Sequence, residues 1–125
     1  MDRPSTSGVA AAAADIAVVV IFVVIGRGSH DENNALLGVI ATAAPFLLAL
    51  LASWLLVTRL GGDPVSVGSG VALWLGTWAG GLLLRWLLFH GGVAPGFIAV
   101  AGAFLFVGLV GWRGIARLAR NRPEN

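Results

Sequence analysis

The sequence predicts an all-α integral membrane protein with four transmembrane helices in an antiparallel bundle, joined by short loops. Two observations lead to this fold class. The 125 residues are 58% hydrophobic and only 11% charged, whereas charged residues make up about a quarter of a typical soluble domain. In addition, four apolar segments each approach the roughly 20 residues that a helix needs to cross the hydrocarbon core of a bilayer.

The expected spans cover residues 8–27, 35–58, 65–89 and 93–112. Residues 1–7 and 113–125 remain as a short N-terminal tail and a basic C-terminal tail, so we expect a single transmembrane domain. Asp15 interrupts the first segment and no small-residue cleavage pattern follows it, which favours a true span over a removed signal peptide. The two-residue alternation of a membrane barrel strand is absent.

The arginines predict the orientation in the membrane. An even number of spans puts both termini on one side, and six of the eight basic residues then fall on that side: Arg3, Arg59, Arg113, Arg117, Arg120 and Arg122, against Arg27 and Arg85. The positive-inside rule therefore predicts a multi-pass protein of the cell (inner) membrane with cytoplasmic N and C termini. Because orientation accounts for the basic charge, we expect no nucleic-acid partner.

The C-terminal tail repeats arginine at positions 113, 117 and 120, a spacing that places the three guanidinium groups on one helix face. We expect Arg113, Arg117 and Arg120 to lie against lipid headgroups. The alternative is a docking surface for a cytoplasmic partner.

Polar and small residues recur at helical spacing within the first three spans, which is how a membrane bundle marks its interior. The residues of these stripes that we expect along a ligand or proton path are Asp15, Thr42, Trp74, Thr77, Trp78 and Arg85. The fourth span has no polar side chain before Trp112, so we expect it to pack against the others or to face lipid.

Asp15 is the most informative of these residues, because an unpaired charge at membrane depth is costly and rare. It lies twelve residues before Arg27, or about 18 Å along a helix. The same count back from Arg85 predicts that Asp15 is level with the indole N–H of Trp74 and the hydroxyl of Thr77, which are its candidate hydrogen-bond partners. It would then handle a ligand or protons, or simply join helices.

Three further residues predict helix packing. Pro45 removes a backbone donor inside the second span and predicts a local break there. Gly76 and Gly80 form a small-xxx-small pair in the third span, a motif that allows close helix contact within one chain or in a homo-oligomer.

A polar cluster is predicted at the outer surface, where two loops meet. It comprises Arg27, Ser29, His30, Asp31, Glu32, Arg85 and His90. We interpret it as the entrance of the ligand or proton path, or as a set of charged contacts that hold the two loops together. We expect no metal, because adjacent ligands lack a regular spacing and nearby arginines oppose a cation. We also expect no cofactor.

Ser29 and His30 are neighbours in sequence and lack the flanking elbow of a nucleophilic serine. No glycine-rich phosphate loop is present either. We therefore expect no enzyme, with an intramembrane acid or base at His30 or Asp31 as the alternative.

Several short motifs follow one another along the chain: an aspartate in the first span, "GRGSHDE", "APF", tryptophan and threonine before "LLLR", and "GWR". In order and spacing they resemble the prokaryotic membrane family catalogued as domain of unknown function 3054, over about Asp15 to Arg113. The resemblance implies a small four-helix membrane protein, frequent in actinobacteria, with no assigned biochemistry. The matching residues are Asp15, Gly26, Arg27, Ser29, His30, Pro45, Phe46, Trp74, Thr77, Arg85, Trp112 and Arg113.

Two function classes follow. The sequence favours the first, transport or binding of a small ligand, anion or protons within the helix bundle. The second is a non-catalytic accessory or assembly subunit of a membrane complex, whose polar stripes only hold helices together. The expected partners are membrane lipids, with a homo-oligomer or a second membrane protein.

Overall fold

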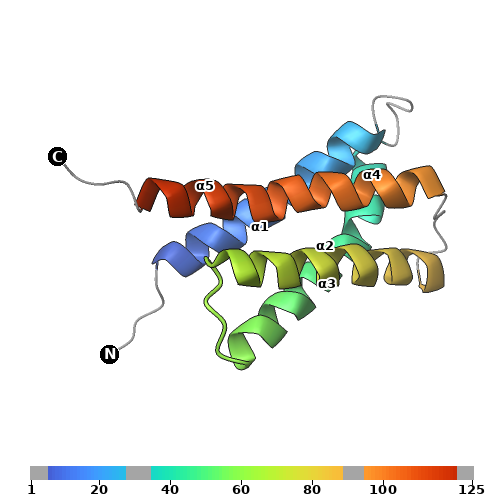
Figure 1. The fold of residues 1–125 in the computed structure, drawn as a ribbon. Coiled ribbons are helices and arrows are strands. Elements are labelled where there is room, and N and C mark those ends of the chain that lie inside the picture. Colours follow the sequence, from blue (N-terminus) through green and yellow to red (C-terminus); the bar gives the residue numbers. More distant parts are fainter. Residues whose placement is uncertain (1–5, 28–34, 89–94, 121–125) are drawn as a thin grey trace.

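Helices make up nearly all of the described structure, a computed structural model that describes residues 6–27, 35–88 and 95–120 (Figure 1). The helices are α1 (Thr6–Arg27), α2 (Ala35–Arg59), α3 (Val67–Leu87), α4 (Pro95–Leu105), the π-helical segment η2 (Phe106–Val110) and α5 (Gly111–Arg120). No strand occurs in these ranges. The predicted all-α class is therefore confirmed.

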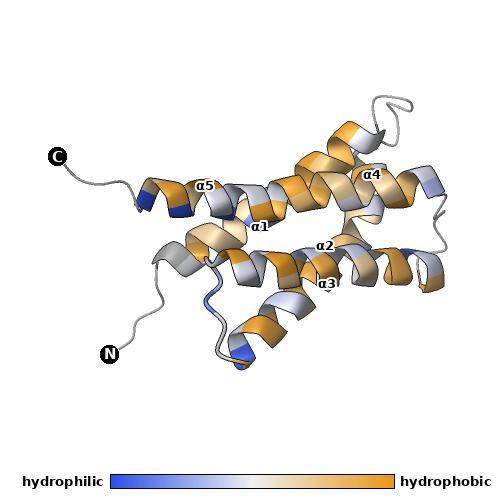
Figure 2. Ribbon diagram, in the orientation of Figure 1, coloured by the Kyte–Doolittle hydropathy of each residue, from blue (hydrophilic) through white to orange (hydrophobic). Residues whose placement is uncertain are grey.

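Within the described ranges, four helices are long and apolar enough to cross a membrane, as the sequence predicted. They comprise Gly8–Gly26, Leu37–Arg59, Val67–Leu87 and Pro95–Arg120. Figure 2 shows hydrophobic residues along the helices and strongly hydrophilic ones at the end of α5 and around the α2–α3 connection.

The fourth helix continues past residue 112, the predicted end of the span, to Arg120, in keeping with the helical spacing of the arginines; α4, η2 and α5 follow one another without a break. The physical reason is that α5 contains no proline and that six of its ten residues are arginine, alanine or leucine, which favour a helix. The basic tail is thus largely part of the fourth helix.

The helices contact one another in a ring. α2 packs along α3, α3 along α4, η2 and α5, and α1 along α2, α4 and η2. Among the described residues α1 has no packing contact with α3, so these two helices lie diagonally across the ring. An aromatic cluster fills part of the centre, with Phe22 and Phe46 in an edge contact at 5.8 Å between ring centroids.

The connection from α2 to α3 is short and ordered by its own hydrogen bonds. Gly61 has φ 85°, and the N–H groups of Gly61 and Gly62 donate to the carbonyls of Thr58 and Val57. This is a Schellman motif, which ends a helix and favours glycine at the positive-φ position. Ser66 then caps α3 by accepting a hydrogen bond from the Ser69 N–H. The connection is consequently held close to the helix ends.

Glycines bring α2 and α3 together. A Cβ atom added at Gly76 would meet the Ser53 side chain, one at Gly80 would lie 3.1 Å from the Cβ of Ala49, and one at Gly81 would meet the ring of Phe46. Pro45 is buried in α2 beside Phe46. The structure thus places Gly76 and Gly80 against a helix of the same chain.

Candidate functional site

The buried carboxylate of Asp15 lies at the point where three helices meet. The side chain is 0% exposed and its two oxygens accept four hydrogen bonds. Oδ1 accepts from Trp112 Nε1 at 2.9 Å and from Arg113 at 2.7 Å. Oδ2 accepts from Trp54 Nε1 at 2.8 Å and from Arg113 at 2.7 Å. Because a carboxylate offers about four acceptor positions, no accepting capacity remains for another donor.

Arg113 of α5 is buried with its partner and is also 0% exposed. Its two terminal nitrogens bond both oxygens of Asp15, the bidentate arrangement in which a guanidinium matches a carboxylate. Its Nε donates to the Pro64 carbonyl at 2.8 Å and Nη1 also donates to the Leu109 carbonyl. The guanidinium stands 4.5 Å from the centroid of the Trp112 ring, within cation–π range. We call Asp15, Trp54, Trp112 and Arg113 the inner knot.

The local helix geometry explains why the knot forms. Side chains on a helix lean toward its N-terminus, so Asp15 leans toward the start of α1 and Arg113 leans back along the fourth helix toward Leu109. Figure 1 shows the start of α1 and the end of α5 at the same end of the molecule. The two side chains therefore approach each other from opposite directions.

The π-helical segment η2 sets which face of α5 is buried. Leu105, Leu109 and Arg113 are all buried and stand four residues apart, a spacing that drifts by about 40° per step in an α-helix. A π-turn holds more residues than an α-turn and reduces that drift. Arg113 consequently stays on the inward face.

Two predictions about these residues are wrong. Arg113 does not extend to lipid headgroups, because it is buried in an ion pair. Asp15 does not bond Trp74 or Thr77, because α1 lies diagonally from α3. Counting residues from Arg27 and Arg85 compares depth along two helices, but it carries no information on which helices are neighbours.

Trp74 and Trp78 instead tie α3 to α4. Their indole nitrogens donate to the carbonyls of Gly102 at 2.9 Å and Ile98 at 3.0 Å. The two indoles are stacked, with centroids 5.4 Å apart, and Phe106 contacts Trp74 edge-on. The tight fit at Gly102, where a Cβ would lie 2.8 Å from Trp78, allows this approach. Both tryptophans thus use their polar atoms for helix contact.

Thr77 is fully buried, and its hydroxyl oxygen has no hydrogen-bond partner among the described residues. An unsatisfied buried hydroxyl costs about 1–3 kcal/mol. Replacing Thr77 by valine, which has nearly the same shape, is therefore expected to leave the free energy of unfolding unchanged or to raise it by about 1 kcal/mol. Unfolding in mixed micelles measures this, and a loss above 1 kcal/mol would show that the hydroxyl has a partner in the folded protein.

The remaining candidate residues lie apart from the knot. Arg85 is half-buried, with its guanidinium 4.8 Å from the ring centroid of Phe97 in α4. Thr42 is half-buried in α2, and Arg117 and Arg120 are exposed at the end of α5. The other members of the outer cluster lie outside the described residues or, for Arg27, have an undescribed side chain: Arg27, Ser29, His30, Asp31, Glu32 and His90.

Two members of the knot were not predicted as site residues, Trp54 and Trp112. Trp54 lies in α2, from which Thr42 alone was predicted along the path. Trp112 and Arg113 belong to the "GWR" motif that accompanies Asp15 in the family resemblance. Asp15 and Arg113 both occur among the positions that match the family, and this co-occurrence was the signal from which an ion pair could have been predicted.

Comparison with known proteins gives one result. A family model described as "Protein of unknown function (DUF3054)" matches residues 12–116, which include the whole inner knot. Neither the search of curated proteins nor that of solved structures gave a match.

Proposed function

The chain belongs to the DUF3054 family, and we propose that it is a non-catalytic accessory or assembly subunit of a membrane complex. In this proposal the four apolar helices cross the inner membrane as an antiparallel bundle, and both termini are cytoplasmic. The excess of arginine at the end that carries Arg59, Arg117 and Arg120 supports this orientation.

The observation that carries the proposal is the saturation of Asp15. A carboxylate that binds cargo or transfers protons needs contact with water or a ligand, whereas Asp15 is 0% exposed and bonded by four donors from α2 and α5. Trp74 and Trp78 are likewise occupied by the carbonyls of α4. These bonds support a structural role for the polar stripes inside the bundle. A partner protein would then bind the outer surfaces of the helices.

Purification of the tagged full chain from its own membrane in mild detergent tests this function. We expect a second membrane protein to copurify at fixed stoichiometry. The mass of the purified complex would then be larger than the summed mass of its copies of the 12.8 kDa chain. The same tagged chain purified from an unrelated host is the control for adventitious association. A native mass made only of copies of this chain and lipid would overturn the proposal.

A second candidate function, a path for protons or a small ligand, rests on the buried hydroxyl of Thr77, which has no hydrogen-bond partner in the described part of the chain. If Thr77 lines such a path, proteoliposomes with a membrane potential would acidify or alkalinise faster than empty vesicles, and Thr77→Val would remove the difference. Equal rates in the wild type, Thr77→Val and empty vesicles would exclude proton conduction through this residue.

A further inference from the structure

Two cavities lie along the surface between α3 and the continuous helix α4–η2–α5, one lined by Arg117 and Arg120 near the end of α5 and one lined by apolar side chains, and we call this surface the groove. We propose that it binds one anionic phospholipid, with the phosphate between Arg117 and Arg120 and an acyl chain along Phe106, Trp74 and Trp78. This inference shares the membrane placement of the proposed function but not its claim about a partner protein.

The basic end is a cavity of about 250 Å³. Its walls come from the α2–α3 connection and the first residues of α3, with Arg117 and Arg120 of α5 opposite them. Among the described residues neither arginine has an ion-pair partner. Asp63 also lines the cavity, but one of its oxygens accepts a hydrogen bond from the Val65 N–H. Among the described lining residues, two guanidinium groups against one carboxylate give a net charge of +1, which suits a phosphodiester.

The faces of α5 place this cavity at the depth of the lipid headgroups. Ile115 and Leu118 are 71% and 70% exposed and point away from the arginine face. An amphipathic end of this kind puts its apolar side chains into lipid and its arginines at the interface. The phosphate of a lipid would therefore reach Arg117 and Arg120 without leaving its normal depth.

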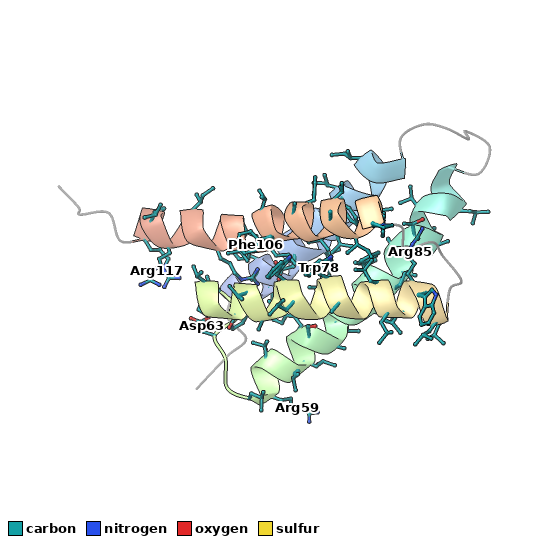
Figure 3. The ribbon with its side chains drawn as sticks, turned by 45° about the vertical axis from the view of Figure 1, so that its right-hand side comes forward. Arg59, Asp63, Trp78, Arg85, Phe106 and Arg117 are labelled. Atoms are coloured by element: carbon teal, nitrogen blue, oxygen red, sulfur yellow. The ribbon has the colours of Figure 1, made fainter. Side chains whose placement is uncertain are left out.

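The apolar part of the groove lies further along the same pair of helices. A second cavity of about 400 Å³ is lined by Trp74, Trp78, Ala99, Gly102 and Phe106, among others. Figure 3 shows Arg117 near the end of α5, with Phe106 and Trp78 further along between α3 and the fourth helix. From Arg117 to Phe106 is eleven residues, or about 16 Å, close to half of the roughly 30 Å hydrocarbon core that one leaflet fills.

Native mass spectrometry of the full chain in detergent, titrated with phosphatidylglycerol, tests the basic end. We expect the double variant Arg117→Gln, Arg120→Gln to bind this lipid about 25-fold more weakly, since each basic residue near a membrane surface contributes a factor of about 5. Arg59→Gln is the matched control, because Arg59 is exposed in the last turn of α2 and does not line the cavity. Equal affinities of the double variant and the control would overturn the proposal.

Filling the groove tests the apolar part. Val107→Phe, about 15 Å along the helix from Arg117, is expected to weaken phosphatidylglycerol binding at least 5-fold, whereas Ala52→Phe on an exposed position of α2 is expected to leave it unchanged. If glycerol 3-phosphate inhibited lipid binding with an affinity equal to that of phosphatidylglycerol, the site would be assigned to a free anion. Displacement of the lipid by a second copy of the chain would assign the groove to a dimer contact, and either result overturns the proposal.

These outcomes are independent of the test for a partner protein. Lipid binding by a chain that purifies without a partner would leave the lipid site standing and refute the subunit role. A stable complex with no preference for phosphatidylglycerol would do the reverse.

Discussion

An Asp15→Asn variant is expected to lose about 3–5 kcal/mol of its free energy of unfolding, the usual effect of removing one partner of a buried ion pair. The substitution keeps the size of the side chain but leaves the guanidinium of Arg113 buried without a counter-charge. It also replaces one oxygen, which accepts hydrogen bonds, by an NH₂ group, which donates them. That NH₂ group would face two other donors, a guanidinium nitrogen of Arg113 and the indole nitrogen of Trp54 or Trp112. Unfolding in mixed micelles, followed by tryptophan fluorescence, measures the loss.

A double variant separates the pair from its surroundings. Asp15→Leu with Arg113→Met removes both charges, so it is expected to be less destabilised than either single substitution, with about 1 kcal/mol lost for each indole left without an acceptor. Arg117→Met is the matched control: Arg117 is one turn further along the same helix and exposed, so we expect a change within about 0.5 kcal/mol. Additive losses from Asp15 and Arg113 would contradict the ion pair.

A Gly81→Ala variant is expected to lose about 1–3 kcal/mol through overpacking. Gly81 is buried in α3, and a Cβ at this position would occupy the place of the Phe46 ring. Phe46 is itself 0% exposed and lies among other aromatic rings, so it has no space into which to move. The same unfolding measurement detects the loss.

Gly68→Ala provides the comparison within the same helix. A Cβ at Gly68 would have no atom within 4 Å, so alanine is expected to be neutral or to stabilise the helix by up to about 1 kcal/mol. If Gly81→Ala were as stable as Gly68→Ala, the close contact between α2 and α3 at Phe46 would not exist in the protein.

The sequence alone was sufficient for the class of fold and for the approximate spans. Their signal is the mean hydropathy of segments of about 20 residues, which depends on composition and not on which helices are neighbours. The fourth helix extends beyond the predicted span to Arg120, because the arginines of α5 lower the hydropathy without interrupting the helix. Helical continuity depends on backbone propensity and capping, which a hydropathy window does not measure.

The candidate site was predicted only in part. Helical periodicity gave Asp15 an inward position, since a carboxylate in an apolar span has to find polar contacts. It gave no information on its partners, which are nearly a hundred residues away in sequence at Trp112 and Arg113 and also include Trp54. The family resemblance contained both charges, but it could not say that they touch.

By itself the sequence therefore determined that this protein has four apolar helices, where each lies approximately, and that Asp15 needs polar partners. Only the tertiary structure decided that α1 lies beside α2 and the fourth helix instead of α3, and that Arg113 is turned inward while Arg117 and Arg120 are exposed. The physical reason is that hydropathy and periodicity are local along the chain. Packing between distant segments sets which helices are neighbours and where each long side chain points. It also sets the wider π-helical turn at η2.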